Sequence, residues 1–319
     1  MTARPRPSPA AFTGGLLAPA AKASGFLGYF LKVLLLRRRI PLIASFKLTY
    51  RCNLACSACP FHQRAGGPGS HMGWETALGS LGNIARLGTK IVVFEGGEPL
   101  LWRDGGHAFA DLALQARKLF PCVGATTNGT LPLDVPTDVL WVSVDGLKDT
   151  HDTLRSSSHD ALVENIRQAR HPKLFIHYTL NRRNVRDFPE AARALLSLEG
   201  VRGITVQFFY PYGLGEDDLS LTSVERRAAA EMVLGLKRSG LRILNSAWGL
   251  TSVGRGGWTC REWILANVEP DGGVSTGCYA RNRGGAKCGE CGFTPVAEAS
   301  GAVGLHPGAL MAGLKIFIL

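Results

Sequence analysis

The chain has 319 residues, of which 45% are hydrophobic and 19% are charged, and its formal net charge at pH 7 is +11. This length and composition allow a full core, in one large α/β domain with an appendage or in two modest domains. Eight cysteines are too few for a disulfide-stapled scaffold of this size, and seven of them fall into two local groups, which indicates metal ligands in a reducing compartment. The basic residues are scattered rather than clustered with aromatic ones, so the charge alone does not favour a nucleic-acid partner.

The N-terminal part of the chain divides into two segments. Residues 1–24 are rich in Pro, Ala and Gly and predict a mobile tail. Residues 25–45 are apolar up to Arg37, too short a stretch for a membrane-spanning helix, which needs roughly 20 apolar residues, and they lack a signal-peptide cleavage site. Two interpretations stay open: a helix on a membrane surface with its arginines at the headgroups, or a helix packed on the protein's own core. The apolar C-terminal stretch 310–319 favours the membrane surface. We therefore expect a cytoplasmic protein, with peripheral binding to the cytoplasmic face of the membrane as a candidate location.

From Phe46 onward, strand patterns alternate with helix patterns. The strands are predicted at 45–50, 90–94, 122–127, 139–144, 174–180 and 203–209, and the helices at 74–87, 107–119, 160–169, 187–198 and 223–240. This alternation of six strands with helices predicts an α/β fold with a parallel sheet curved into a partial (β/α)6 TIM barrel. Reactive groups of such barrels lie on loops at the carboxyl ends of the strands. Cys122, the cysteine outside both groups, begins the third strand and is expected to be a small core residue.

The first cysteine group follows the first predicted strand. Cys52, Cys56 and Cys59 have the spacing Cys-x3-Cys-x2-Cys. Four thiolates would ligate a [4Fe–4S] cluster completely, whereas three leave one iron free to bind a small molecule. A structural zinc site would need a fourth ligand, which His62 could supply as a Cys3His set. The spacing favours the iron–sulfur interpretation.

Three more motifs follow the next three strands: FEGGEPLL at 94–101, TTNGT at 126–130 and VSVDGLKDTHDTLR at 142–155. With the cysteine triplet, they resemble the radical S-adenosylmethionine superfamily over roughly residues 46–245. The resemblance implies that the three cysteines hold three irons, while the fourth iron chelates the amino and carboxylate groups of S-adenosylmethionine. It also implies that an electron from a reduced flavodoxin- or ferredoxin-type donor breaks the C–S bond, and that the 5′-deoxyadenosyl radical abstracts hydrogen from a substrate.

The resemblance assigns roles around the second strand. Gly96 and Gly97 would let the backbone approach the methionyl end of the cofactor, where a side chain would collide. Glu98 would offer a carboxylate near the cofactor's ammonium group. Many members of the family carry an aromatic residue before the third cysteine, where this chain has Ala58. Adenine packing would then come from Phe61 or from the run 207–213.

The resemblance also assigns roles around the third and fourth strands. Ser143 and Asp145 would contact the ribose and the carboxylate of the cofactor, with Asn128 and Arg155 as neighbours. Local structure offers an alternative for two of these positions, because Asn-Gly at 128–129 can be only a turn and Asp-Gly at 145–146 only a strand exit.

The second cysteine group comprises Cys260, Cys278, Cys288 and Cys291. Four thiolates form a complete tetrahedral set, and the Cys-x2-Cys pair at its end is a common half of a zinc site. The spacing of the first two cysteines and a small hairpin expected at 268–279, with Asp-Gly as its turn, resemble the SPASM/twitch extensions that hold auxiliary clusters in this superfamily. The full SPASM pattern has more cysteines than this chain. The resemblance implies one fully ligated auxiliary [4Fe–4S] cluster that carries electrons or shapes the pocket, with zinc as the alternative.

We therefore expect four regions: a tail and basic amphipathic segment at 1–45, a radical core at 46–245, a small C-terminal iron–sulfur extension at 246–293 and an apolar segment at 294–319. The predicted function is hydrogen abstraction from an organic substrate. The basic, apolar N-terminal segment favours a small-molecule substrate such as a lipid, isoprenoid or quinone-like compound.

Rival functions remain. A ribosomal peptide is the alternative substrate, because many SPASM-bearing relatives modify peptides, although we expect the stretch before Phe46 to be too short for a leader-binding domain. No RNA-binding domain and no nucleic-acid partner are expected. A non-catalytic scaffold or electron carrier with two metal sites is a different class, and the paired glycines and Glu98 argue against it.

Overall fold

The computed structural model describes residues 19–57, 59, 61, 64–211, 217–278, 288 and 291–319. The strands of its main sheet are β1 (Ile43–Thr49), β2 (Ile91–Gly96), β5 (Cys122–Thr127), β6 (Val139–Ser143), β7 (Leu174–Leu180), β8 (Val201–Phe208), β9 (Leu265–Val268) and β10 (Val274–Thr276). Their spatial order is β10-β9-β1-β2-β5-β6-β7-β8, and every neighbouring pair is parallel except β9 and β10. A second, two-stranded sheet pairs β3 (Arg103–Asp104) with β4 (His107–Ala108).

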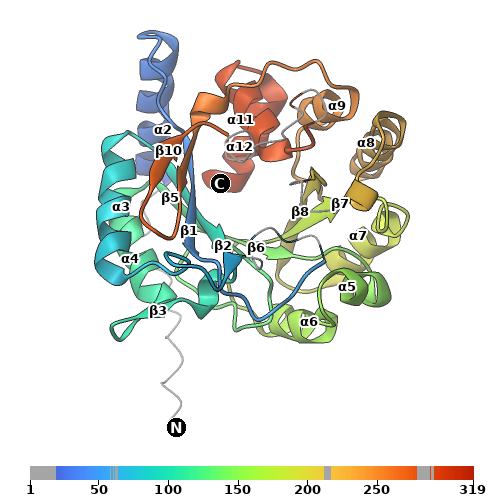
Figure 1. The fold of residues 1–319 in the computed structure, drawn as a ribbon. Coiled ribbons are helices and arrows are strands. Elements are labelled where there is room, and N and C mark those ends of the chain that lie inside the picture. The colour runs from blue at the N-terminus through green and yellow to red at the C-terminus, as the bar shows by residue number, and fades with distance from the viewer. Residues whose placement is uncertain are drawn as a thin grey trace.

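The helices are α2 (Pro19–Leu34), α3 (Trp74–Arg86), α4 (Phe109–Leu119), α5 (Lys148–Leu154), α6 (His159–Gln168), α7 (Phe188–Ser197), α8 (Ser223–Arg238), α9 (Ala247–Arg255), α11 (Thr294–Val303) and α12 (Pro307–Phe317). Short 3-10 turns are η2 (Pro99–Leu101), η3 (Asp217–Leu219) and η4 (Glu262–Ile264). Figure 1 shows α3 to α8 on the outside of the curved sheet. The predicted partial (β/α)6 barrel is confirmed, with strand and helix ends within a few residues of the predicted ones.

The sheet separates two apolar layers. Side chains that alternate along each strand face the outer helices, as Phe46 and Phe94 do, and both are fully buried. The opposite face of the strands lines the inside of the barrel, where Trp141, Phe175 and Cys122 join a separate apolar cluster. Cys122 is 0% exposed, so its prediction as a core residue is confirmed.

Helix α2 covers the N-terminal ends of the strands. Phe26 and Tyr29 are buried in the inner cluster, and the Tyr29 hydroxyl donates to the Ile40 carbonyl oxygen at 2.7 Å. Lys22 forms a buried ion pair with Asp138, just before β6. The interpretation of this segment as a helix on the protein's own core is therefore confirmed for one face of α2.

Two further expectations concern the same segment. The expected mobile tail is wrong for residues 19–24, which form the first turns of α2, because Pro19 starts the helix, alanines favour it and Lys22 anchors it. Residues 1–18 lie outside the described residues. None of the helices within the described ranges is long and apolar enough to cross a membrane.

The sheet is open between its edge strands β8 and β10, and α9, α11 and α12 occupy this side of the ring (Figure 1). The predicted hairpin at 268–279 forms as β9 and β10, and the positive φ of Gly272, +87°, lies in its turn. Residue 279 lies outside the described residues. The sequence did not predict that β9 pairs in parallel with β1, which makes the hairpin an extension of the barrel sheet.

Candidate active site

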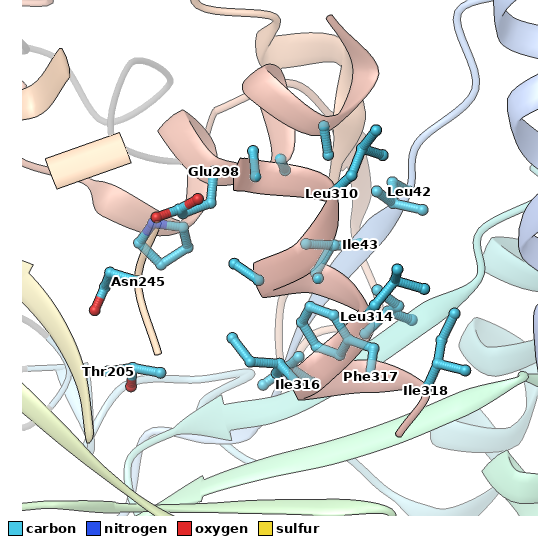
Figure 2. A pocket seen from close by; sticks show the side chains of 18 of the residues that line it. Leu42, Ile43, Thr205, Asn245, Glu298, Leu310, Leu314, Ile316, Phe317 and Ile318 are labelled. Atoms are coloured by element: carbon cyan, nitrogen blue, oxygen red, sulfur yellow. The ribbon is translucent and has the colours of Figure 1, made fainter. Parts of the chain in front are cut away.

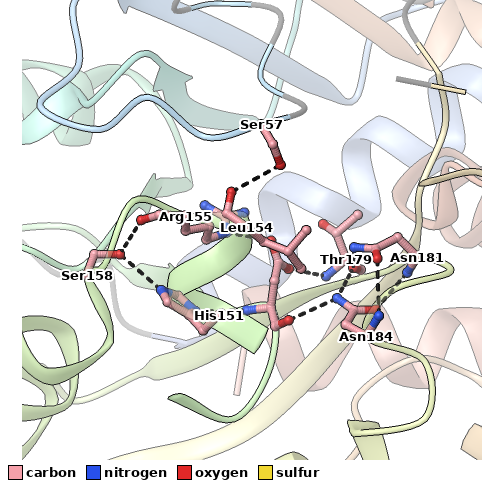
Figure 3. Close-up of polar contacts among 9 residues, drawn as sticks. Ser57, His151, Leu154, Arg155, Ser158, Thr179, Asn181 and Asn184 are labelled. Atoms are coloured by element: carbon pink, nitrogen blue, oxygen red, sulfur yellow. Dashed lines mark hydrogen bonds and ion pairs between the residues drawn. The ribbon is translucent and has the colours of Figure 1, made fainter. Parts of the chain in front are cut away.

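The loop that carries the first cysteine group leaves β1 at the carboxyl end of the sheet. Backbone N–H groups anchor it to the end of α5 and the residues after it: Ala55 donates to the Ser156 Oγ at 3.1 Å and Ser57 to the Leu154 carbonyl oxygen at 3.2 Å. The Ser57 hydroxyl donates to the same carbonyl oxygen, as Figure 3 shows. The loop is therefore held by the end of the fourth strand motif and the residue after it, as well as by β1.

The three cysteines of this loop are free thiols of intermediate exposure. Burial raises the pKa of Cys52 and raises that of Cys56 to about 11, and the charges of neighbouring cysteines in the group raise both further. Thiols in such a setting keep their protons unless a positively charged centre binds them as thiolates. A set of three adjacent sulfur ligands on one loop therefore fits an iron–sulfur cluster.

Two N–H donors point at the first of these sulfurs. The Cys52 Sγ accepts from the Leu54 backbone N–H at 3.4 Å and from the Asn128 Nδ2 at 3.6 Å. Hydrogen bonds to ligand sulfurs raise the reduction potential of an iron–sulfur cluster. Asn128 was expected only as a neighbour of S-adenosylmethionine, and this second contact could not be read from the sequence.

Gly96 and Gly97 are needed for a reason that lies within the protein. A Cβ on Gly97 would lie 2.1 Å from the Arg51 carbonyl oxygen, and one on Gly96 would lie 2.6 Å from that of Thr49. Gly96 also has a φ of +121°. The glycine pair thus lets the second strand motif pack against the residues that lead into Cys52. Its expected contact with the cofactor stays a prediction.

Glu98 is fully buried and hydrogen-bonded inside the protein. One oxygen accepts from the Leu100 N–H at 3.0 Å and from the Thr127 hydroxyl at 2.8 Å, and the other accepts from the Asn128 N–H at 2.7 Å. Burial raises the pKa of Glu98 to about 7, although these hydrogen bonds act in the opposite direction. The carboxylate joins the carboxyl ends of β2 and β5 and fixes the backbone of Asn128.

Asp145 and Arg155 form a buried ion pair, with the Nε and Oδ2 atoms 2.5 Å apart. The other Asp145 oxygen accepts from the Thr179 N–H at 3.0 Å, and Asn184 donates to the Asp145 carbonyl oxygen at 3.0 Å. The guanidinium of Arg155 lowers the pKa of Cys56, against the larger effect of burial, so it lies close to that thiol. The structure therefore brings Arg155 and the cysteine loop together.

His151 completes this network. Burial lowers the pKa of His151 to about 4, so the ring is neutral at pH 7. Its Nδ1 accepts from the Asp145 N–H at 3.2 Å, and its Nε2 lies 3.0 Å from the Ser158 hydroxyl. The Asp145-Gly146 pair is therefore a strand exit, as one interpretation had it, and it also carries a charge that the protein holds rigidly.

The remaining predicted residues are placed as follows. Ser143 is buried at the end of β6. Phe61, one candidate for packing on adenine, stacks on Tyr50 with 5.7 Å between ring centroids. Ala58, His62 and residues 212–213 of the other aromatic run lie outside the described residues. Among the described residues, no three His, Cys, Asp or Glu side chains are gathered closely enough to hold a single metal ion.

A cavity of about 520 Å³ fills the inside of the barrel. Its polar lining comes from the middle and carboxyl ends of strands, as with Glu95, Thr126 and Thr205, and from Asn245 and Glu298. Its apolar lining comes from the N-terminal ends of strands and from α2 and α12. Figure 2 shows Thr205, Asn245 and Glu298 on one side and the apolar side chains of α12 on the other. The cavity is thus polar toward the cysteine end of the barrel and apolar toward the base.

Buried polar groups that line the cavity, or that bond to its lining, were missed at the sequence level. Lys47 has a side chain without exposure, donates to Ser45 at 2.8 Å and pairs with Glu269 at 3.4 Å, while Ser45 bonds Glu95. Burial lowers the pKa of His177 to about 4. Their only signal in the sequence was a polar residue at an inward position of a strand.

A family model described as "Radical SAM superfamily" matches residues 46–195. These residues are a radical SAM domain. The family implies binding of a [4Fe–4S] cluster and of S-adenosylmethionine, and it indicates an enzyme. The matched range begins in β1 and ends in α7, so it includes the cysteine loop, Glu98 and the Asp145–Arg155 pair.

Two curated relatives are similar in sequence to this chain. The chain is 28% identical to Fe-coproporphyrin III synthase of Methanosarcina barkeri over 208 residues, which cover 60% of this chain and 50% of that protein. It is 29% identical to the sporulation killing factor maturation protein SkfB of Bacillus subtilis, over 46% of this chain and 34% of that protein. The match thus spans half or less of the length of these two relatives.

The fold of the radical SAM domain recurs in solved structures. The crystal structure of Streptococcus suis SuiB bound to precursor peptide SuiA aligns with a TM-score of 0.61 over 81% of this chain and 65% of that chain. The sequences are 15% identical, so this likeness concerns the fold.

The buried ion pair of the radical SAM domain yields a stability prediction. Removing Arg155 leaves the Asp145 carboxylate buried without its cation, so Arg155→Gln should destabilise the protein by about 3–5 kcal/mol. Thermal unfolding should show a large drop in Tm, and most of it should be recovered in the double variant Asp145→Asn/Arg155→Gln. The control is Arg183→Gln, which breaks the exposed Arg183–Asp218 pair and should change Tm little. If Arg155→Gln and Arg183→Gln lowered Tm by the same amount, the buried Asp145 carboxylate would not depend on Arg155.

Glu298 yields a prediction about pH. One of its oxygens accepts from the Ser246 N–H at 2.7 Å, while Oε2 has no hydrogen-bond partner among the described residues. Burial raises the pKa of Glu298 to about 7 from 4.5, so the folded protein binds more protons than the unfolded chain between these values, and stability falls as pH rises through that window. Glu298→Gln should therefore raise Tm at pH 8 and leave it nearly unchanged at pH 5. The exposed Glu231 provides the control, Glu231→Gln, and equal Tm changes at the two pH values would refute the assignment.

The second cysteine group lies beside the open side of the sheet. Burial raises the pKa of Cys260 to about 12, and the charges of Cys278, Cys291 and Cys288 raise it further. Residue 292, next to Cys291, accepts at its carbonyl oxygen from the Phe208 N–H of β8 at 3.2 Å. The four predicted ligands belong to the segments before and after the β9–β10 hairpin, and their binding of a [4Fe–4S] cluster or of zinc stays a prediction.

Proposed function

We propose that this protein is a radical S-adenosylmethionine enzyme that abstracts hydrogen from an organic substrate held inside the barrel. When bound at Cys52, Cys56 and Cys59, a reduced [4Fe–4S] cluster would supply the electron that cleaves S-adenosylmethionine to methionine and a 5′-deoxyadenosyl radical. The observation that carries the proposal is the place of these thiols, at the end of the barrel toward which the enclosed cavity is polar.

The residues around the cysteines would orient the cofactor. Seven form the proposed site for S-adenosylmethionine: Gly96, Gly97, Glu98, Asn128, Ser143, Asp145 and Arg155. Hydrogen bonds link Glu98 to Asn128 and Asn128 to Cys52, and the Asp145–Arg155 pair is held beside Cys56. Such groups, fixed before binding, hold a reactive molecule in one geometry without further reorganisation.

The cavity supports a compact substrate with an apolar part. Its apolar end at the base of the barrel would take the hydrocarbon portion, while Thr205, Asn245 and Glu298 would bind polar groups nearer the cysteines. A protein cavity of this kind excludes water, and this exclusion protects a carbon radical from side reactions. A small reduced flavodoxin- or ferredoxin-type protein would supply the electron.

A peptide substrate is the second candidate. It is favoured by the relatives, because SkfB is named a maturation protein and the SuiB structure contains a precursor peptide. The two candidates differ in how much of the substrate the cavity must enclose: a small molecule enters whole, whereas a peptide would place one side chain inside.

The proposed function is tested with anoxically prepared protein, chemically reduced and mixed with S-adenosylmethionine. We expect 5′-deoxyadenosine and methionine to form in equal amounts, as measured by mass spectrometry. If S-adenosylmethionine stays intact in protein that contains its full complement of iron and sulfide, the chain is a metal-binding scaffold or electron carrier instead.

We further propose that residues 246–293 form a SPASM/twitch-like region with one auxiliary [4Fe–4S] cluster, beside a core at 46–245. Cys288→Ala should then lower iron and acid-labile sulfide to the content of one cluster, because one iron of the auxiliary cluster would lose its only protein ligand at an exposed position, with no bound cofactor to replace it. Metal analysis distinguishes the alternatives: unchanged iron with a loss of zinc would assign the site to zinc. Cys122→Ala, which changes a core cysteine, should leave both contents unchanged.

A further inference from the structure

The outer face of α2 is apolar. Leu27, Leu31 and Leu35 are 62%, 48% and 72% exposed, and their spacing of four residues puts them on one side of the helix. The other side is the one that packs into the barrel. Soluble surface helices normally carry polar side chains on the side that faces away from the core. A helix that is apolar on both sides indicates a second apolar environment.

Helix α12 adds to the same end of the molecule. The Ile316 carbonyl oxygen accepts from the Lys173 Nζ at 3.0 Å, just before β7, so this helix also ends at the N-terminal side of the strands. Met311 and Leu314 on α12 are 50% and 37% exposed. We define the base face as Leu27, Leu31, Leu34, Leu35 and Leu36 with Met311 and Leu314.

The charges next to the base face are positive. Lys32 lies in the last turn of α2, the three arginines at 37–39 follow this helix, and Lys315 lies on α12. The sequence contains no acidic residue before Glu75 and none after Glu298. Lys32, the three arginines and Lys315 therefore have no acidic residue near them in the sequence.

The end of α2 is shaped to present these cations. The Arg38 N–H donates to the Lys32 carbonyl oxygen at 3.3 Å, and Arg37 has a φ of +50°. The chain thus turns back on the helix end at a residue in the left-handed region, a position that glycine normally takes after a helix. The chain keeps an exposed arginine there instead, at the negative end of the helix dipole.

We propose that the base face docks on an anionic lipid bilayer. The leucines would insert at the boundary between headgroups and acyl chains, and the cations would bind lipid phosphates, as in helices that lie in the plane of a membrane. The proposal goes beyond the proposed function and does not depend on it. Since the exposed Leu27 and Leu314 also line the barrel cavity, docking would bring the apolar end of that cavity to the lipid.

The test is cosedimentation of the full chain with vesicles of phosphatidylglycerol and phosphatidylcholine in equal parts, compared with vesicles of phosphatidylcholine alone. We expect binding to the anionic vesicles that weakens at high salt. Arg37→Gln/Arg38→Gln/Arg39→Gln should lower partitioning about 100-fold, at roughly fivefold per cation. Leu27→Gln/Leu31→Gln/Leu35→Gln should lower it by about as much. Val224→Gln, on the outside of α8 and 78% exposed in the wild type, should change nothing.

Three outcomes would overturn the proposal. The first is a wild-type protein that ignores anionic vesicles, and the second is unchanged binding by the leucine variant with an unchanged Tm. The third is a wild-type dimer that the leucine substitutions turn into a monomer, which would assign the base face to a second copy of the chain. Because Cys56→Ala should bind vesicles like the wild type, failure of docking and failure of radical chemistry are separate results.

Discussion

Cys56→Ala should abolish formation of 5′-deoxyadenosine while the fold survives. Cys56 is the middle ligand of the first cysteine group and lies beside both Cys59 and the Arg155 guanidinium. With two thiolates left, the loop can no longer hold three corners of a cluster. The variant should therefore lose the iron and sulfide of one cluster, and its product should fall to the level of a buffer control. Mass spectrometry of the reduced, anoxic reaction measures this directly.

Cys122→Ala is the matched control for this variant. Cys122 lies in β5, is fully buried and belongs to neither cysteine group. Its replacement should retain iron, sulfide and cleavage of S-adenosylmethionine. Continued production of 5′-deoxyadenosine by Cys56→Ala, or its loss in Cys122→Ala at unchanged Tm, would contradict the ligand assignment.

Gly97→Ala should disrupt the same site from the opposite side. The added Cβ would lie 2.1 Å from the Arg51 carbonyl oxygen and 2.7 Å from the carbonyl carbons of Tyr50 and Arg51. The chain before Cys52 must therefore shift. Backbone atoms cannot yield as a side chain can, and we expect destabilisation of about 3 kcal/mol, near the upper end of the usual cost of overpacking. Lower Tm and lower iron loading after reconstitution are the two measurements.

Gly79→Ala provides the contrast. Gly79 is an exposed residue within α3, and a Cβ there meets nothing within 4 Å. Alanine favours a helix interior over glycine by about 0.5–1 kcal/mol, so this variant should be slightly more stable than the wild type, with normal iron loading. If Gly97→Ala behaved like Gly79→Ala, the close packing of the glycine pair on Arg51 would not hold.

The barrel could be predicted because its signals are local. Each strand is an apolar run that ends at a turn or a motif, as at Cys122–Thr127 and Leu174–Leu180, where the predicted ends agree with the structure. The pairing of β9 with β1 could not be predicted, since it joins segments more than two hundred residues apart and its register depends on packing. The side of α2 that becomes buried was equally undetermined, because leucines and aromatic residues occur on both sides.

The candidate site was predictable in its residues and less so in its contacts. Motif spacing places Cys52, Glu98 and Asp145 at neighbouring strand ends, and the structure gathers them there. The sequence could not show that Glu98 is fully hydrogen-bonded within the protein, because its partners come from η2 and β5. Glu298 gave no signal, since a single acid in an apolar segment acquires its meaning only from the cavity that surrounds it.

The most direct test of the account is Mössbauer spectroscopy of 57Fe-enriched protein prepared without oxygen, before and after addition of S-adenosylmethionine. The account predicts that the cofactor changes the signal of a single iron in one [4Fe–4S] cluster, because only that iron lacks a protein ligand at Cys52, Cys56 and Cys59. A spectrum that the cofactor leaves unaltered, in protein with a full content of iron and sulfide, would contradict it.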